Sequence, residues 1–328
     1  MLLVMKNILI SGISGQDGIF LTSKILSEEK EINIIGISRQ NKNHVYEKLH
    51  YLNIDESMFG KVNVLNINLE NFNEINHLIQ DFNFYSVYNL SGPSSINKSF
   101  SNKYNINAIE NIFDNLTNSL IKNHNFCNFF QASSSEMFSS NNLKNLNEDS
   151  KLEPRSPYAI AKYKNHKKVL RLKNKYNWNI TSGILFNHES EFRSSEFLIK
   201  KIIKSVISIN KKQQDFLTVG TLDYIRDWSH ARDICNGIYL VTNNSKGSHY
   251  VIGSGEGNSI RDVVDFCFSY FGMDYEKYIQ IDKNLLRKGD PEKIIADNTK
   301  ITKDFNWKAS ISFKDMLESI INYELKFG

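Results

Sequence analysis

The sequence predicts an α/β protein with a doubly wound parallel sheet and a smaller, partly interleaved C-terminal domain. Two observations support this fold class. Between residues 7 and 26 an apolar run, a glycine-rich turn and a helical pattern follow one another, and strand-like runs then alternate with helical patterns as far as Leu185. Strands that alternate with helices form parallel sheets covered by helices. Past Leu185 the alternation weakens, which indicates the second domain.

The first predicted strand is Asn7–Ser11, and the helical pattern over Ile19–Leu26 follows it. Between them, the glycines Gly12, Gly15 and Gly18 permit a tight turn and a close approach of the backbone to a pyrophosphate, which a helix N-terminus attracts. This strand–turn–helix order is typical of a Rossmann fold. The spacing differs from the commoner Gly-x-Gly-x-x-Gly fingerprint, and an ordinary strand–helix turn is the alternative.

The second predicted strand, Ile32–Ser38, ends at Arg39. In a dinucleotide fold the residue after this strand meets the adenosine ribose, where an acid favours the free 2′-hydroxyl and an arginine accommodates a 2′-phosphate. Arg39 therefore favours NADP over NAD. A solvated arginine at a strand end is the alternative.

The later elements continue the alternation. Strands are predicted over Lys61–Ile67, Ser86–Leu90, Phe126–Ala132 and Ile180–Leu185, and helices over Asn73–Phe82, Ile106–Asn123 and Tyr158–Tyr176. Ligands of such sheets bind beyond the carboxyl ends of the strands. We therefore expect the segments Leu90–Ser94 and Ala132–Glu136 to line one cleft with the cofactor.

Domain boundaries follow from this pattern. We expect residues 1–186, with a return of roughly 227–250, to form an NADP-binding Rossmann domain. Residues 187–328 are expected to form mainly a substrate-binding lobe, where polar clusters stand among short strand and helix signals.

Tyr158 and Lys162 lie four residues apart, so on a helix they project from one face. A cation held there favours the phenolate, which makes Tyr158 a candidate base near neutral pH. The alternative is an amphipathic helix with a packed tyrosine and a solvated lysine.

Composition limits the class of protein. The 328 residues are 41% hydrophobic and 23% charged, and the net charge of +4 comes from 40 basic and 36 acidic residues spread along the chain, so no nucleic-acid tail stands out. The cysteines Cys127, Cys235 and Cys267 are widely separated, which favours buried, reduced thiols, a cytoplasmic location and no metal site. No apolar run reaches the roughly 18 residues of a membrane span.

Several longer motifs together resemble one family. They are Gly12-Ile-Ser-Gly-Gln-Asp-Gly18, Gln131-Ala-Ser-Ser-Ser-Glu136, Pro154-Arg-Ser-Pro-Tyr-Ala-Ile-Ala-Lys162, Gly183-Ile-Leu-Phe-Asn-His-Glu-Ser190 and Arg226-Asp-Trp-Ser-His-Ala231. In this order they are similar to GDP-mannose 4,6-dehydratases of the extended short-chain dehydrogenase/reductase superfamily. The resemblance runs from about Asn7 to about Leu325.

The resemblance implies a catalytic set of Ser134, Glu136, Tyr158 and Lys162. In the family chemistry, the tyrosine takes the C4 hydroxyl proton of the sugar while NADP accepts hydride from C4. The glutamate then removes the C5 proton and assists loss of the C6 hydroxyl as water, and hydride returns to C6. A reductase of the same fold has no C5 proton to remove, so Glu136 favours a dehydratase.

The resemblance also implies binding residues. Those expected to contact NADP are Gly12, Gly15, Gln16, Asp17, Gly18, Arg39, Asn68, Leu69, Leu90, Tyr158, Lys162, His188 and Arg193. Those expected to contact the nucleotide sugar are Ser94, Asn187, Lys201, Arg226, Arg287 and Glu292. Arg193 also matches a position where the family binds the sugar nucleotide. Asn68 stands where the family has an aspartate, and its amide oxygen can still accept a hydrogen bond from adenine.

Departures from the family pattern gather near the substrate, at Ser91–Ser95, Phe192, Ser195 and Arg287–Pro291. They leave open a different sugar, such as a GDP-heptose or another nucleotide hexose. The loop Arg39-Gln-Asn-Lys42 differs from the family's assembly loop, so a homodimer is as plausible as a tetramer. Two further hypotheses are a reductase or epimerase of a 4-keto nucleotide sugar, and a non-catalytic NADP-sensing or scaffolding protein.

Overall fold

The computed structural model describes residues 5–101, 103–139, 145–244, 249–286 and 289–328. The chain divides into two compact units. The first, the sheet unit, comprises Met1–Phe138, Leu152–Leu185 and Cys235–Ile252. The second unit comprises Ser139–Lys151, Phe186–Ile234 and Gly253–Gly328. Compared with the expected Rossmann domain, the sheet unit lacks residues 139–151, and its returning segment begins at Cys235 and ends at Ile252.

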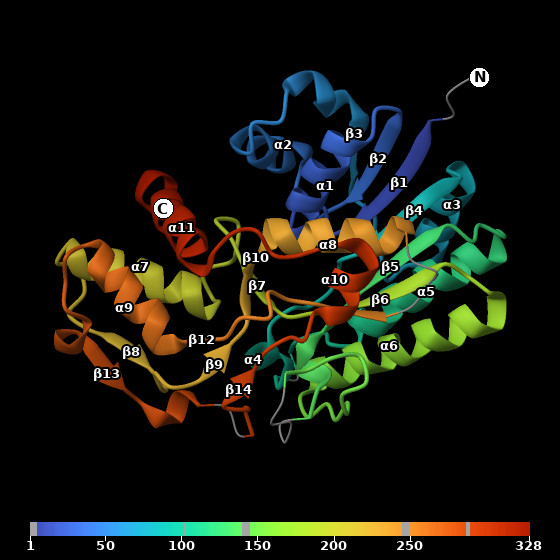
Figure 1. The fold of residues 1–328 in the computed structure, drawn as a ribbon. Helices are drawn as coiled ribbons and strands as arrows, with labels where there is room; N and C mark the ends of the chain where they lie inside the picture. Colours follow the sequence, from blue (N-terminus) through green and yellow to red (C-terminus); the bar gives the residue numbers. More distant parts are fainter. Residues whose placement is uncertain (1–4, 102, 140–144, 245–248, 287–288) are drawn as a thin grey trace. The chain divides into compact units, whose positions relative to one another are not determined.

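The described part of the sheet unit contains one sheet of seven parallel strands in the order β11-β6-β5-β4-β1-β2-β3 (Figure 1). The strands are β1 (Lys6–Ser11), β2 (Ile32–Ile37), β3 (Val62–Leu65), β4 (Phe84–Asn89), β5 (Asn128–Ser134), β6 (Ile180–Leu185) and β11 (His249–Ile252). The strand order reverses between β1 and β4, which is the point where such sheets bind ligands. The predicted doubly wound fold class is confirmed.

Helices cover both faces of this sheet. They are α1 (Gln16–Glu28), α2 (Lys42–Tyr51), α3 (Phe72–Asp81), α4 (Ile96–Ser99), α5 (Ala108–Lys122), α6 (Pro157–Tyr176) and α8 (Ala231–Asn244), the last of which begins in the second unit. On one face lie α3, α5 and α6 (Figure 1). The core on this side includes Val87, Phe113, Leu116 and Phe129. Helix α1 contacts α8 through the Cys235 thiol, which donates to the Asp17 carbonyl at 3.2 Å.

Strand β5 runs to Ser134, two residues beyond its predicted end. The sequence signal fades there because serines follow an apolar run. In the sheet these serines are buried and paired: the hydroxyl groups of Ser133 and Ser182 lie 2.8 Å apart, and Ser182 also lies 2.9 Å from Nδ1 of His166. A buried polar side chain with partners is tolerated in a strand, so the strand continues.

The second unit contains small sheets around a helical core. Strands β7 (Asn187–Glu189) and β10 (Trp228–His230) pair in parallel, as do β8 (Leu217–Val219) and β13 (Ile279–Ile281); β12 (Asn258–Ser259), β9 (Ile225–Arg226) and β14 (Lys293–Ile294) form a third sheet. Its helices are α7 (Leu198–Asn210), α9 (Ile260–Tyr270), α10 (Thr299–Phe305) and α11 (Phe313–Phe327), and short 3₁₀ turns occur at η1 (Glu56–Lys61), η2 (Ser135–Met137), η3 (Tyr275–Lys277) and η4 (Lys283–Leu285) along the chain. Apolar side chains from α7, α9 and α11 form one core.

A buried aspartate organises the loops of the second unit. The Asp227 carboxylate accepts hydrogen bonds from the backbone of Ser254 at 2.9 Å, Gly255 at 2.8 Å and Ala296 at 3.1 Å. Burial raises the pKa of this carboxyl group, and these hydrogen bonds oppose the rise. The side chain therefore ties two loops together.

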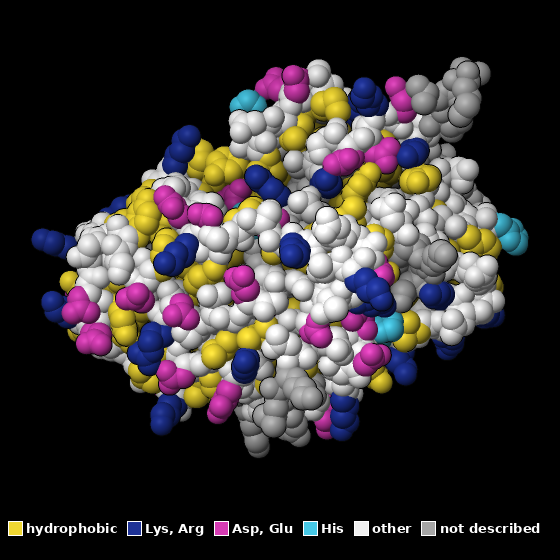
Figure 2. Space-filling view, in the orientation of Figure 1, with side chains coloured by type: hydrophobic (Ala, Val, Ile, Leu, Met, Phe, Trp, Pro, Cys, Tyr) yellow, Lys and Arg dark blue, Asp and Glu magenta, His cyan; other side chains and the backbone are white. Residues whose placement is uncertain are grey.

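Surface charge is mixed. On the face drawn in Figure 2, Lys and Arg side chains lie among Asp and Glu side chains, and neither sign gathers into a continuous region. Among the residues that the structure describes, we find no helix with the length and apolarity needed to cross a membrane. The three cysteines are buried and free, as the sequence predicts.

Candidate functional site

The glycine-rich turn between β1 and α1 is closely packed against its own backbone. Gly12 has φ of +79°, and its N–H donates to the Ile37 carbonyl of β2 at 2.9 Å. A Cβ atom on Gly18 would lie 2.4 Å from the Gly12 carbonyl oxygen. The turn thus needs glycine at both positions. Because its N-cap, Gly15, has no side chain, α1 presents its first N–H groups without a capping side chain, as an anion site requires.

The end of β2 carries Arg39, the residue expected to select the cofactor. Arg39 is exposed, and the neighbouring Ser38 hydroxyl donates to the Ser14 hydroxyl at 2.8 Å. The ammonium of Lys48 on α2 donates to the Ser14 carbonyl at 3.0 Å, which places a second cation at the glycine-rich turn. Lys48 was missed in the sequence because α2 itself was not predicted, its apolar pattern being weak.

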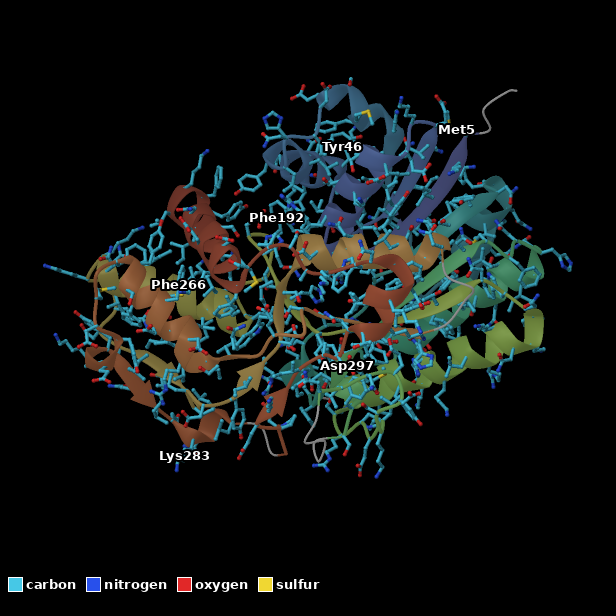
Figure 3. All side chains as sticks on the ribbon, in the orientation of Figure 1. Met5, Tyr46, Phe192, Phe266, Lys283 and Asp297 are labelled. Carbon is cyan, nitrogen blue, oxygen red and sulfur yellow. The ribbon has the colours of Figure 1, made fainter. Side chains whose placement is uncertain are left out.

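Helix α2 is fixed by Tyr46, which is labelled in Figure 3. Its hydroxyl donates to the Val62 carbonyl at 2.9 Å, and its ring stacks on Phe59 with centroids 4.8 Å apart. This anchor holds the turn of α2 that carries Lys48.

The residues expected near adenine lie after β3. The Asn68 amide oxygen accepts from the Glu70 N–H at 3.0 Å, and the Leu69 carbonyl accepts from Asn115 at 3.0 Å. An amide oxygen has two lone pairs, so Asn68 retains one for a ligand. At the end of β4, the Leu90 N–H donates to the Ser11 carbonyl at 3.3 Å. Ser94, four residues further on, is exposed.

Ser134 and Glu136 lie together where β5 ends. Ser134 is the last residue of the strand and is 8% exposed, and its hydroxyl accepts from the Glu136 N–H at 3.3 Å. Glu136 lies in the short turn η2 and is partly buried. The turn therefore places a carboxylate and a hydroxyl side by side at the carboxyl edge of the sheet.

Tyr158 and Lys162 lie in the first turns of α6. Ser156 caps this helix by accepting from the Ala159 N–H at 3.1 Å, and Pro157 occupies its first position. The Lys162 ammonium lies 5.8 Å from the centroid of the Tyr158 ring. The predicted helix and the proximity of the pair are present in the structure.

The Lys162 ammonium is buried against β5. It donates to the Ala132 carbonyl at 2.8 Å, and the side chain is 6% exposed overall. Burial lowers the pKa of Lys162 to about 8, while the negative charge of Asp17 opposes that change. At neutral pH the lysine still carries its charge.

The remaining predicted residues belong to the second unit. The Arg226 guanidinium is 6% exposed and donates to the Asp290 carboxylate at 3.0 Å and to the Glu292 carbonyl at 3.3 Å. The side chains of Glu292 and Lys201 are exposed. Arg226 is thus held in place by protein groups. Arg287, the other arginine predicted to bind the nucleotide part, lies outside the described residues.

The segment after β7 carries three further predicted residues. Nδ1 of His188 lies 2.7 Å from the Phe186 carbonyl, and Asn187 begins the strand. Nε of Arg193 lies 3.4 Å from the Glu189 carboxylate, and the guanidinium carbon lies 3.4 Å from the centroid of the Phe197 ring. Ion pair and ring together fix the orientation of this arginine.

Phe192, labelled in Figure 3, stands at one of the departures from the family pattern. Its ring packs edge-on against Tyr323 of α11, with centroids 5.9 Å apart, whereas Ser195 is exposed. Phe192 is therefore part of a packed aromatic contact within the second unit.

Comparison with known sequences decides the family. The sequence model described as GDP-mannose 4,6 dehydratase matches residues 9–320. The chain belongs to this family. "GDP-mannose 4,6 dehydratase 2" of Arabidopsis thaliana is 27% identical over 330 residues, covering 98% of this chain and 88% of the relative.

Solved structures agree with this membership of the GDP-mannose 4,6-dehydratase family at the level of the fold. A dTDP-glucose 4,6-dehydratase from Bacillus anthracis, solved with NAD, aligns with a TM-score of 0.82 at 18% identity, covering 98% of this chain and 97% of that one. RMD from Pseudomonas aeruginosa, complexed with NADPH, aligns with a TM-score of 0.78 at 16% identity, covering 97% and 99%. In this family member, the described residues include no group of three or more His, Cys, Asp and Glu side chains that could hold a metal ion.

Proposed function

We propose that this chain is an NADP-dependent nucleotide-sugar 4,6-dehydratase that converts GDP-mannose, or a closely related GDP-sugar, to the 4-keto-6-deoxy sugar. The observation that carries the proposal is the position of Glu136 beside Ser134, at the carboxyl end of β5, in the unit that also contains Tyr158 and Lys162. The fold is shared with reductases and epimerases of the superfamily. A dehydratase needs one further group, a base that removes the C5 proton, and the Glu136 carboxylate would supply it.

The glycine-rich turn fits a dinucleotide. Gly12 has a positive φ and Gly18 has no room for a Cβ atom, and the start of α1 offers N–H groups to a pyrophosphate. Arg39 and Lys48 supply positive charge at the end of β2, which favours a 2′-phosphate and hence NADP. Asn68 and Leu90 would line the adenine and nicotinamide sides.

When bound, NADP would supply the redox chemistry by accepting hydride from C4 of the sugar and returning it to C6. Tyr158, as phenolate, takes the proton from the C4 hydroxyl, and Lys162 stabilises that phenolate. The 4-ketone acidifies the proton on C5. Glu136 removes this proton and gives one to the departing C6 hydroxyl, which leaves as water. Ser134 orients the C4 oxygen through its hydroxyl group.

The second unit supplies charge for the nucleotide part. Arg226 is suited to phosphate by its planar donors, and its bond to Asp290 holds it in one orientation. At position 192 the family has an arginine, which offers hydrogen-bond donors, whereas this chain has a packed apolar ring. We therefore propose that this position helps choose the sugar. Cytoplasmic location and a homo-oligomeric state remain predictions.

Incubation of the protein with GDP-mannose and substoichiometric NADP tests the function. We expect a product lighter by one water that carries a 4-ketone, without accumulation of NADPH, because the hydride returns to the sugar. Consumption of cofactor in proportion to product would contradict the proposal. A thermal-shift screen with GDP-, UDP-, CDP- and dTDP-sugars in the presence of NADP identifies the nucleotide, since a ligand of the folded state raises apparent stability.

The substitution Glu136→Gln separates a dehydratase from a reductase. A dehydratase should lose about 100-fold or more in kcat, because a positioned acid–base group contributes on the order of 10²–10⁴. A reductase of a 4-keto sugar should keep most of its activity. Tyr158→Phe should abolish turnover in either enzyme, and unchanged turnover in that variant would refute the role of Tyr158 as the base.

A further inference from the structure

A chain of buried polar side chains crosses the carboxyl ends of three neighbouring strands in the sheet unit. Ser11, Asn89 and Gln131 are 0%, 1% and 1% exposed. They are register neighbours, since Ser11 pairs with Asn89 and Asn89 pairs with Gln131. The Ser11 hydroxyl donates to Oδ1 of Asn89 at 2.8 Å, and Nδ2 of Asn89 donates to Oε1 of Gln131 at 2.7 Å.

This row of hydrogen-bonded side chains ends at the Ala132 carbonyl, which also accepts a hydrogen bond from Lys162. Nε2 of Gln131 donates to the Ala132 carbonyl at 2.9 Å, and the Lys162 ammonium donates to the same oxygen at 2.8 Å. A carbonyl oxygen has two lone pairs, so these two donors occupy both. Gln131 therefore leaves one acceptor direction for Lys162.

The orientation of both amides is determined. The Ala132 carbonyl can only accept, so Gln131 turns its NH₂ group toward it and its Oε1 toward Asn89, whose NH₂ group then faces Gln131 and whose Oδ1 accepts from Ser11. Reversing either amide would place two acceptors or two donors against each other at a buried site, which is costly. Aligned hydrogen bonds of this kind also polarise one another.

We propose that Asn89 and Gln131 are positioning residues for Lys162. By fixing the Ala132 carbonyl and occupying its second lone pair, they hold the ammonium at its distance from Tyr158. The inference rests on the proposed function in one respect, because Tyr158 and Lys162 matter as a pair only if they act on a substrate. Since Ser11 directly precedes Gly12, this row of hydrogen bonds also connects the glycine-rich turn to Lys162.

The electrostatic surroundings of the lysine make the inference testable. The negative charge of Asp17 on α1 acts on Lys162, and the Tyr158 ring on the same helix has its centroid 5.8 Å from the ammonium. The chain of amides carries no charge. A neutral replacement of Gln131 therefore changes the position of the ammonium without adding or removing a charge.

The substitution Gln131→Met tests the role, with Asn76→Leu as the matched control. Asn76 is another buried amide of the sheet unit and is 8% exposed. It accepts hydrogen bonds from Ser119 and Asn123, which are not part of the Ser11–Asn89–Gln131 row. The ultraviolet titration difference between each protein and the same protein carrying Tyr158→Phe reports the pKa of Tyr158 without any turnover. We expect Gln131→Met to raise that pKa by about half a unit or more, because the stabilising cation is less well placed.

Kinetics should change in the same variant. We expect kcat to fall about tenfold, a part of the 10²–10⁴ that acid–base groups supply, with the KM for the nucleotide sugar within about twofold. The control should leave both the Tyr158 titration and kcat near those of the wild type. Equal losses in both variants would reduce Gln131 to a structural residue and overturn the proposal.

The substitution Gln131→Glu gives an independent test that needs no control variant at another site. A protonated glutamic acid can still donate to the Ala132 carbonyl and accept from Asn89, whereas the ionised form cannot donate. Activity relative to wild type should therefore recover as pH falls through the pKa of the new carboxyl group, which burial raises and the nearby Lys162 ammonium lowers. A variant with the pH profile of the wild type would contradict the inference.

The two proposals fail separately. A shift of the Tyr158 titration in a protein that does not dehydrate any GDP-sugar would refute the proposed function and support the positioning role. Dehydratase activity with an unchanged Tyr158 titration in both Gln131 variants would refute the positioning role and support the function.

Discussion

Replacing Lys162 by methionine should make the folded protein more stable while it abolishes activity. Lys162 is 6% exposed and keeps a charge at neutral pH in a place where burial lowers its pKa from 10.5 to about 8. The lowered pKa measures how much the folded protein disfavours the charged form. Methionine keeps the apolar stem and removes the charge.

The expected gain can be worked from these values. Each pKa unit corresponds to about 1.36 kcal/mol, so holding the ammonium at neutral pH costs roughly 3 kcal/mol. Methionine loses the hydrogen bond to the Ala132 carbonyl, worth about 1 kcal/mol, although Gln131 still donates to that oxygen. The net effect is a gain of about 2 kcal/mol in the free energy of unfolding, or several degrees in Tm at about 2–4 °C per kcal/mol.

The gain depends on pH in a stated direction. Between pH 8 and pH 10.5 the unfolded chain keeps the lysine proton that the folded chain has lost, so the stability of the wild type rises with pH. The methionine variant lacks this titration. Its advantage over the wild type should therefore be largest below pH 8 and shrink toward about pH 10.

Urea unfolding of the protein without ligands, followed by circular dichroism at neutral pH and near pH 10, measures both effects. Lys164→Met is the matched control, because Lys164 lies on the same helix but is exposed and pairs with Glu110 at 2.9 Å. An exposed pair contributes about 0–1 kcal/mol, so the control should change little. If Lys162→Met is less stable than the wild type, by the same amount at both pH values, the reasoning is refuted.

Three further outcomes are expected. Burial lowers the pKa of His166 to about 4, so the folded state should lose roughly 3 kcal/mol as pH falls from 6.5 to 4, and His166→Gln should remove that loss in acid unfolding curves. Gly18→Ala should weaken NADP binding at least about tenfold and destabilise the fold by about 1–3 kcal/mol, measured by titration and by Tm, because its Cβ would lie 2.4 Å from the Gly12 carbonyl. Lys48→Met should weaken NADP binding about fivefold to tenfold but NAD binding less than about twofold, because one screened charge pair near a surface contributes about 1 kcal/mol.

Much of the sheet unit could be predicted because its signals are local. The first six strands and the glycine-rich turn were found, since an apolar run of strand length followed by glycines is visible in the sequence. The seventh strand, His249–Ile252, was missed because it is four residues long and returns to the sheet after a segment that belongs to the other unit. Its place beside β6 depends on a crossover that no local pattern encodes.

The second unit was predicted less well for a related reason. Its strands are two or three residues long, and the loops next to them are tied together by one buried carboxylate, Asp227, whose partners Ser254 and Ala296 lie 27 and 69 residues further along the sequence. Such strands have no periodicity to detect. The Arg226 side chain illustrates this point: the sequence predicts a phosphate ligand, and the structure adds a bond to Asp290, 64 residues away.

In the candidate site, too, the residues that local spacing brings together could be predicted. Tyr158 and Lys162 are one helical turn apart and Ser134 and Glu136 share one turn, so spacing alone brings each pair together. The residues that position these groups could not be predicted in this way. Gln131 is, in the sequence, a polar residue after an apolar run, which predicts only a strand end.

Strand register is the information that reveals these supports. Ser11 and Asn89 are 78 residues apart and Asn89 and Gln131 are 42 apart, yet each pair is adjacent across the sheet. A buried ammonium that disfavours the fold has to be held by satisfied polar neighbours, and in a parallel sheet these come from strands separated by whole crossover connections. The residues that perform the chemistry can therefore be predicted from short motifs, whereas the residues that set the position and charge of those groups emerge only once the strands are placed in order.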